Sequence, residues 1–239
     1  MAVYKNKPAI QGEGSTSVID RHTQRGEAIT APLFAGGAQM LTDEGSYFVA
    51  TNATWETAIA GGITATFSDI VGLLAIRNTA ATGGKRIFLD YIRLIMTVIP
   101  ASGTNQHFGI TVDNALTRFT SGGTALTPKN LNLGSDQETI AAVNFGVLTI
   151  AAISSKGIRA GRMQARTTVG VVGDVYEFKF GSLSIPAQGP AKATTSDHIV
   201  MHCAPVVLNG QEVMVLHHWA ASNATTGPSY EIEMGWSER

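Results

Sequence analysis

The last third of the chain, residues 198–236, has the pattern of three closely spaced β-strands. Residues 230–236 read YEIEMGW, so large apolar side chains alternate with glutamate or glycine, the period of a strand with one buried face. The pair Asn209-Gly210 readily takes the positive φ angles of a tight turn. It separates two apolar runs, 206–208 and 212–219. We therefore expect these two runs to form a hairpin within a sheet.

Runs of β-type residues recur from residue 46 onward, and no long amphipathic helix interrupts them. They predict eight to ten strands: Ser46–Thr51, Val71–Asn78, Arg86–Ile99, Gln106–Val112, Val147–Ile153, Gln164–Val169, Val175–Phe180, His198–Ala204, Gln211–Ala220 and Ser229–Trp236. The intervening segment 120–142 contains no clear strand and is expected to be a long loop. This arrangement predicts an all-β fold, a jelly-roll-like β-sandwich.

The chain of 239 residues is expected to form one domain, residues 46–239, preceded by an extended N-terminal arm, residues 1–45. The arm is rich in glycine and proline and keeps no periodic pattern, so it is expected to become ordered by lying on another surface. Six apolar residues in it are predicted to make that contact: Ile10, Val18, Ile19, Ile29, Leu33 and Phe34.

Charge and composition argue against several classes of partner. Charged residues make up 15% of the chain and the formal net charge is −1, so no overall field favours nucleic acid or an anionic membrane. The first 30 residues hold four basic and three acidic side chains, too balanced for an arm that neutralises phosphates. The longest apolar run, 139–153, is interrupted by Asn144 and is shorter than the roughly 18–20 residues of a membrane span. We expect no membrane or nucleic-acid partner and no export signal.

One basic run stands out, with four cations within eleven residues and no acid among them: Lys156, Arg159, Arg162 and Arg166. Such a run is able to dock on an acidic protein or on phosphates. A solvated basic loop explains it equally well, and the sequence leaves both interpretations open.

The sequence contains no convincing catalytic or metal-binding motif. If the predicted hairpin keeps simple register, His202 faces His217, but a catalytic metal needs a third ligand that the sequence does not place nearby. Asp174 and Glu177 flank a strand start and are better explained as solvated acids than as a glycosidase pair. Residues 80–85, AATGGK, depart from a phosphate-binding loop at the first glycine and after the lysine. Cys203, the only cysteine, is predicted to be a small buried side chain. We predict a non-enzymatic protein without a cofactor.

Three stretches carry a resemblance to a known class of protein. They are TSGGTALTPKNLN at 120–132, VGDVYEFKFG at 172–181, and HWAAS at 218–222 together with PSYEIEMGWSER at 228–239. Together they resemble virion structural proteins of tailed bacteriophages, over about residues 70–239. The resemblance implies a β-sandwich that decorates or cements a capsid, often as a trimer. It implies no catalytic residues.

The resulting expectation is a capsid decoration or cement protein. Its partner would be the major capsid protein, and its place the capsid surface of a virion assembled in the host cytoplasm. The abundant neutral surface further suggests a homotrimer whose contacts include the C-terminal strands. The alternative is a tail-fibre or receptor-binding sandwich that recognises host glycans, in which Trp55 and the segment 120–142 would contact the sugar.

Overall fold

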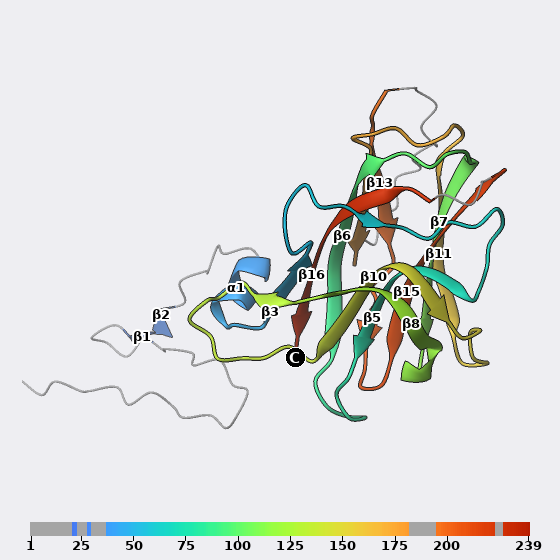
Figure 1. Cartoon of the computed structure of the whole chain (residues 1–239). Coiled ribbons are helices and arrows are strands. Elements are labelled where there is room, and N and C mark those ends of the chain that lie inside the picture. The colour runs from blue at the N-terminus through green and yellow to red at the C-terminus, as the bar shows by residue number, and fades with distance from the viewer. Residues whose placement is uncertain (1–20, 23–27, 30–36, 182–194, 223–226) are drawn as a thin grey trace, which may run out of the picture.

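Two β-sheets packed face to face form the body of the protein (Figure 1). The computed structural model describes residues 21–22, 28–29, 37–181, 195–222 and 227–239. The all-β sandwich predicted from the sequence is confirmed. Its jelly-roll character stays a prediction.

The first sheet has six antiparallel strands. In spatial order they are β11 (Ile158–Arg166), β7 (Thr104–Asp113), β15 (Val213–Ala221), β5 (Val71–Asn78), β10 (Ala141–Ile150) and β8 (Phe119–Leu126). A short 3₁₀ helix, η1 (Leu116–Arg118), leads into β8.

The second sheet has eight strands. Its main order is β13 (His198–Cys203), β12 (Val175–Phe180), β6 (Ile87–Val98), β16 (Ser229–Glu238), β3 (Tyr47–Thr51) and β9 (Lys129–Asn130), and two short strands, β14 (Val207–Leu208) and β4 (Ile59–Ala60), pair with β6 and β16. Strands β12 and β13 run parallel, and the other pairs are antiparallel. Away from both sheets, β1 (Arg21–His22) pairs with β2 (Ala28–Ile29).

The core lies between the inner faces of the two sheets. Phe108 of the six-stranded sheet contacts the rings of Tyr176 and Phe178 of the other sheet, with centroids 4.9 and 5.4 Å apart. A second, smaller apolar cluster lies on the opposite face of the six-stranded sheet and is formed by Ala75, Leu148, Ile150, Val213 and Val215. The partly buried Phe119 packs on it, under the guanidinium of Arg77. Both faces of the six-stranded sheet are therefore partly covered, which removes more apolar surface from water than one interface would.

Eight of the ten predicted strands match described strands closely, and Val71–Asn78 and Val175–Phe180 have the predicted bounds. The other two are displaced, because the predicted strand 147–153 covers only the end of β10 and the predicted strand 164–169 shares only residues 164–166 with β11. The alternation at residues 230–236 is confirmed as well, because the apolar set of β16 is buried in the core and the glutamates are only half-buried.

The predicted hairpin around Asn209-Gly210 is wrong. The two flanking strands, β14 and β15, belong to different sheets, so this turn carries the chain across the core. The residue with positive φ is Gln211, at 72°. Most connections between described strands also cross from one sheet to the other, for example those from β5 to β6 and from β6 to β7. Strands that are neighbours in sequence are therefore rarely neighbours in a sheet.

The segment 120–142 is not a long loop, because it contains most of β8, all of β9 and the start of β10. β8 is an edge strand with most of its side chains exposed, so it lacks the apolar alternation that identifies a strand. Gly122, at φ 93°, lies against a bulge in β10, where a Cβ atom would come within 2.5 Å of the Val147 carbonyl oxygen. The glycines that look like breakers in the sequence thus fit the edge strand onto its irregular neighbour.

Part of the predicted arm is helical. Helix α1 (Gly37–Asp43) consists mainly of good helix formers, and Gly45, at φ 71°, ends it. The amide of Ser46 donates to the Leu41 carbonyl and that of Gly45 to Thr42, the hydrogen bonds of a Schellman cap. Of the predicted arm contacts, Ile29 lies in β2, whereas Ile10, Val18, Ile19, Leu33 and Phe34 lie outside the described residues.

Among the residues that the structure describes, no helix is both long and apolar enough to span a membrane.

Two tryptophans provide a stability test of this fold. The indole of Trp236 is fully buried between the sheets and its N–H donates to Glu238, whereas Trp55 is 83% exposed. We expect Trp236→Ala to lower the free energy of unfolding by about 3–5 kcal/mol, because it leaves a cavity and removes one of the hydrogen bonds that Glu238 accepts. Trp55→Ala should change it by less than about 0.5 kcal/mol. Urea unfolding followed by circular dichroism measures both, and equal effects would contradict the assignment of Trp236 to the core.

Candidate functional site

The outer face of the eight-stranded sheet carries a row of polar side chains. Cross-strand register places Glu177 of β12 beside Arg93 of β6, Arg93 beside Glu233 of β16, and Glu233 beside Thr51 of β3. All four residues lie on the face opposite the core, since their neighbours along each strand point inward. This row crosses the sheet at its centre, where four strands contribute side chains to one surface.

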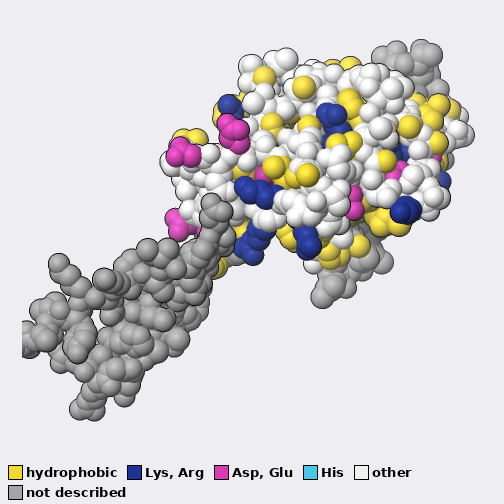
Figure 2. Space-filling view, turned by 90° about the horizontal axis from the view of Figure 1, so that it is seen from below, with side chains coloured by type: hydrophobic (Ala, Val, Ile, Leu, Met, Phe, Trp, Pro, Cys, Tyr) yellow, Lys and Arg dark blue, Asp and Glu magenta, His cyan; other side chains and the backbone are white. Residues whose placement is uncertain are grey.

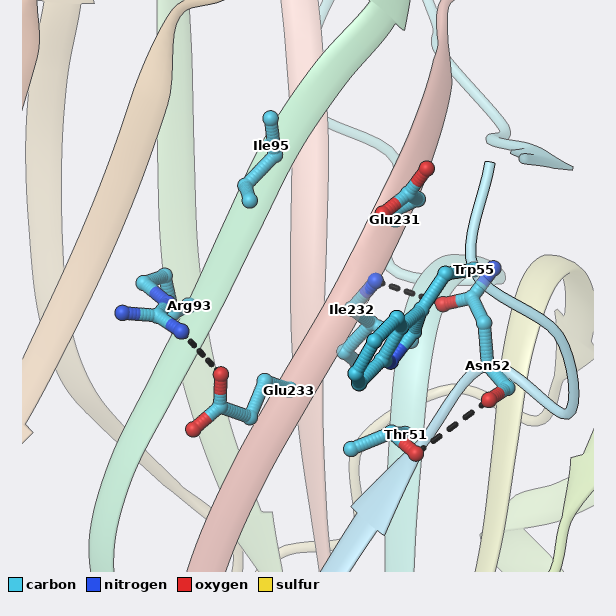
Figure 3. A pocket seen from close by; sticks show the side chains of 8 residues that line it. All are labelled: Thr51, Asn52, Trp55, Arg93, Ile95, Glu231, Ile232 and Glu233. Carbon is cyan, nitrogen blue, oxygen red and sulfur yellow. Dashed lines mark hydrogen bonds and ion pairs between the residues drawn. The ribbon is translucent and has the colours of Figure 1, made fainter. Parts of the chain in front are cut away.

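A hollow of about 280 Å³ opens at one end of this row (Figure 3). It is lined by Thr51, Asn52, Trp55, Arg93, Ile95, Glu231, Ile232 and Glu233. Trp55 comes from the connection between β3 and β4, and Figure 3 shows its indole beside β16, next to Glu231. Asn52 anchors this connection, because its amide donates to the Thr57 carbonyl while its oxygen accepts from the Ile232 amide. These two hydrogen bonds of Asn52 fix the connection that carries the exposed Trp55 ring.

Most of the polar groups in the hollow already have partners. Glu233 forms an ion pair with Arg93 and accepts a hydrogen bond of 2.6 Å from the Tyr91 hydroxyl. Burial and this hydrogen bond raise the pKa of Tyr91, so its hydroxyl stays protonated and keeps donating. Glu231 differs, because its carboxylate has no hydrogen-bond or ion-pair partner among the residues that the structure describes. The sequence alternation marks Glu231 and Glu233 as outward-facing but gives no means of telling them apart.

The predicted basic run lies mainly on the outer face of the six-stranded sheet. Arg159 lies over the ring of Phe67, 5.8 Å from its centroid, and Arg162 lies 5.6 Å over Trp219. His107 stacks on the same indole, with centroids 5.3 Å apart. The exposed Lys156 precedes this group in the turn before β11. Arg159 and Arg162 therefore belong to an aromatic and basic surface on β11, which begins at residue 158, whereas Lys156 lies in the turn before this strand.

Arg166 does not belong to this surface, which corrects the predicted patch. Its side chain is fully buried and forms two hydrogen bonds of 2.6 and 2.5 Å to the carboxylate of Asp174. Burial opposes the charge of Arg166, but these contacts raise its pKa. The same carboxylate accepts from the Tyr176 hydroxyl and from the amides of Val171 and Asp197. A bulge in β11 after Gln164 explains why Arg166 points inward while Arg162 points outward.

The structure also separates the residues weighed as catalytic groups. Asp174 is buried and pairs with Arg166, whereas Glu177 lies on the outer face with Lys179 and His198. Residues 80–85 form a turn between β5 and β6, and the Ala80 carbonyl oxygen accepts from Gln211. Cys203 is buried, as predicted, and desolvation raises the pKa of its thiol to about 12.

The predicted approach of His202 to His217 is wrong, because these residues lie in different sheets. Nδ1 of His217 lies 2.9 Å from the Val71 carbonyl oxygen, which only accepts, so Nδ1 carries the proton. Nε2 then accepts from the Thr111 hydroxyl at 3.0 Å. Burial lowers the pKa of His217. Over the described ranges, no three side chains of His, Cys, Asp or Glu gather in a way suited to a metal ion.

A hollow and several exposed apolar side chains lie beside α1. The hollow is lined by Ala38, Gln39, Thr42, Tyr47, Tyr91 and Leu131. Leu133 is 95% exposed and Met40 and Leu131 are also exposed. Figure 1 shows α1 and the segment with β9 together at one side of the sandwich. The Asn132 side chain donates to the Asp43 carbonyl, which holds the segment after β9 against the end of α1. The exposed residues of these two segments, Met40, Leu131 and Leu133, are called the apolar edge below. It was not predicted, because no pattern in the sequence indicates that the two segments meet.

Comparison with protein-family models, with curated proteins and with solved structures finds no match for this chain. The functional argument therefore depends on the residues and their arrangement.

A buried histidine makes stability depend on pH. His218 stacks on Phe108 at 4.5 Å, and complete burial lowers its pKa to about 3 from the ordinary 6.5. The unfolded chain therefore binds a proton below pH 6.5 that the folded chain does not, so this group destabilises the fold increasingly as pH falls toward 3.

We expect His218→Leu to flatten this dependence by up to about 1.4 kcal/mol per pH unit between pH 6 and 4. Urea unfolding of both proteins across this range measures the two slopes. The difference at pH 8, where the imidazole is neutral in both states, gives the baseline cost of the substitution. Parallel curves for the two proteins would show that His218 is accessible to protons in the folded state.

Proposed function

We propose that this chain is a non-enzymatic structural protein of a tailed-bacteriophage particle, and that it binds the outside of the capsid as a decoration or cement protein. The resemblance over residues 120–132, 172–181, 218–222 and 228–239 supports the particle class. The β-sandwich fold is compatible with that class. The observation that carries the role in attachment is the apolar edge beside α1.

The apolar edge is suited to a protein partner. Leu133 is almost fully exposed, and its neighbours Met40 and Leu131 add further apolar surface. Exposed apolar side chains that gather in one place favour protein contacts, whereas single ones do not. The edge also includes part of the predicted arm, residues 1–45, because Met40 lies in α1. Arm and edge together would provide one continuous attachment surface for the major capsid protein.

The remaining surface fits a protein held among many neighbours. Figure 2 shows a face on which charged side chains are few and most of the surface is uncharged, with apolar side chains scattered across it. Two of the buried cations, Arg118 and Arg166, are engaged by Asp69 and Asp174 and serve the fold. The proposed place is the capsid surface of a virion assembled in the host cytoplasm.

A second candidate function is recognition of host glycans by a tail-fibre or receptor-binding protein. The exposed indole of Trp55, beside a hollow with polar groups, favours it, because aromatic faces with nearby hydrogen-bonding groups are suited to a small ligand. The segment 120–142 contributes no residue to this hollow. Binding of the isolated protein to a glycan array, with loss on Trp55→Ala, would favour this second function.

Deleting residues 1–30 tests the attachment role. We expect the truncated protein to remain folded, because the sandwich lies wholly within residues 46–239, and to occupy particles less fully after dilution and mild heating. Each arm contributes weakly, since the entropy of ordering it offsets much of its apolar burial, and many arms act together on one particle. Occupancy is measured by quantitative gel electrophoresis of purified particles.

The double variant Leu131→Ser and Leu133→Ser should weaken occupancy in the same direction. Val172→Ser, which alters an apolar side chain before β12 whose exposure is close to that of Leu131, provides the control and should leave occupancy unchanged. Unchanged occupancy for both the truncated protein and the double variant would refute attachment through the arm and the apolar edge.

We also propose that the protein forms a homotrimer with C-terminal strand residues at its contacts. Closed cyclic symmetry is the usual way in which a protein with much neutral surface remains soluble, and threefold positions exist on an icosahedral shell. Sedimentation equilibrium of the purified protein should give three times the monomer mass. A monomer whose mass does not change with concentration would contradict this assembly in solution.

A further inference from the structure

The hollow beside Trp55 has the size and the walls of a site for a single side chain. Its volume of about 280 Å³ lies at the lower limit of small-molecule sites. Ile95 of β6 and the indole of Trp55 give it apolar walls, while Thr51 and Asn52 form its polar end. A group that enters it would therefore contact apolar surface along its length and polar groups at one end.

Trp55 provides an aromatic wall that the fold itself does not need. Its ring is 83% exposed, whereas the ring of Trp236 on β16 is fully buried. No hydrogen bond of its indole N–H is found among the described residues. An aromatic ring of this size is mostly apolar, so its exposure to water is unfavourable. The face of an indole ring is also the side-chain surface that attracts cations most strongly.

The charges around this ring are unbalanced. Arg93 and Glu233 neutralise each other, and Tyr91 donates to the same carboxylate. Glu231 is half-buried and without a partner among the described residues, so the lining has one uncompensated negative charge. A partly buried carboxylate without a partner carries a desolvation cost, which a cation in the hollow would offset.

We propose that the hollow between Trp55 and Glu231 binds a basic side chain, the ammonium of lysine or the guanidinium of arginine, presented by a protein partner. The cation lies against the indole face and pairs with the Glu231 carboxylate. Its aliphatic stem lies along Ile95. That the basic group belongs to a protein rests on the proposed attachment function. The preference of the hollow for a cation rests on Trp55 and Glu231 alone.

A neutral sugar fits this site less well. Its hydroxyl groups would stack and hydrogen-bond beside Trp55, but they would leave the charge of Glu231 uncompensated. The pairing of Arg93 with Glu233 likewise leaves no free cation to favour an anionic ligand at the rim. The charge of the hollow therefore favours a basic group over a neutral sugar or an anionic ligand. Binding through this charge should weaken as the salt concentration rises.

The experiment titrates the isolated full-length protein with N-acetyl-arginine amide and N-acetyl-lysine amide. The indole N–H signals of the three tryptophans report the contact by NMR, and Trp55→Ala assigns one of them. We expect the Trp55 signal to shift saturably while the Trp236 signal stays fixed. Raising the salt concentration from 50 to 500 mM should weaken the binding several-fold.

Glu231→Gln should weaken binding at least about tenfold, the equivalent of ~1.4 kcal/mol. Trp55→Ala, read out by calorimetry, should do the same, and Trp55→Phe should retain part of the affinity. Glu138→Gln removes an equal charge from an exposed position outside the hollow and should have no effect. Thermal unfolding of each variant confirms that it is folded.

N-acetyl-glutamine amide and methyl glucoside provide the neutral comparison. Saturable binding of the glucoside in place of the two cations would overturn the proposal and favour a glycan site. The absence of any shift with the cations, or unchanged affinity in Glu231→Gln, would overturn it as well. None of these results depends on particles, so failure here is distinguishable from failure of the proposed capsid role, which particle occupancy measures.

Discussion

The ring of Phe108 lies where the two sheets meet, and the packing around it constrains the rest of the molecule. It stacks on His218 within its own sheet and contacts Tyr176 and Phe178 across the core. Because one face of each sheet must supply such apolar contacts, polar chemistry is restricted to the outer faces, the connections and a few internal ion pairs. The row from Glu177 to Thr51 and the basic surface of β11 lie on those two outer faces.

The internal ion pairs tie connections to the sheets. Arg118 of η1 pairs with Asp69 and donates to the Ala151 carbonyl oxygen, which links three connections on the outer face of the six-stranded sheet. Asp174 joins β11 to the turn before β12 through Arg166. A buried ion pair adds little net stability compared with apolar packing, but losing one partner leaves an unpaired buried charge. These pairs therefore specify where the connections lie more than they stabilise the core.

The local sequence pattern predicted the positions of several strands, because a strand's position depends mainly on the residues within it. Alternation located β16, and β-type runs located β5 and β12. β12 and β16 bury one face, whereas β5 is a continuous apolar run that is buried on both faces. Strand pairing was not predictable in this way. The turn at Asn209-Gly210 has the residues of a hairpin, yet it connects two sheets, since the choice between pairing and crossing depends on which inner face the next strand can cover.

The candidate site shows the same limit. From the sequence, Trp55 was named as a sugar contact of the alternative function, and the alternation of β16 marked its glutamates as outward-facing. Which glutamate is free depends on Tyr91 and Arg93 of the neighbouring strand, and therefore on a register that the sequence does not specify. Arg166 was misassigned for a related reason, because a bulge within β11 reverses the side to which its side chain points.

If the protein attaches to a particle as proposed, the distribution of groups on its surface favours several weak contacts over one strong contact. The apolar edge beside α1, the hollow at Trp55 and the basic surface at Arg159 and Arg162 lie on different elements of the fold. Each is formed by a few side chains, whereas a stable protein interface buries about 800 Å² on each partner. A protein that binds one partner tightly concentrates its contacts in a single patch. A protein held in a lattice meets several neighbours at once, and there separate weak contacts add up to durable binding because they must all be released together. Three small and chemically distinct surfaces on a sandwich with few charges are what the second situation requires.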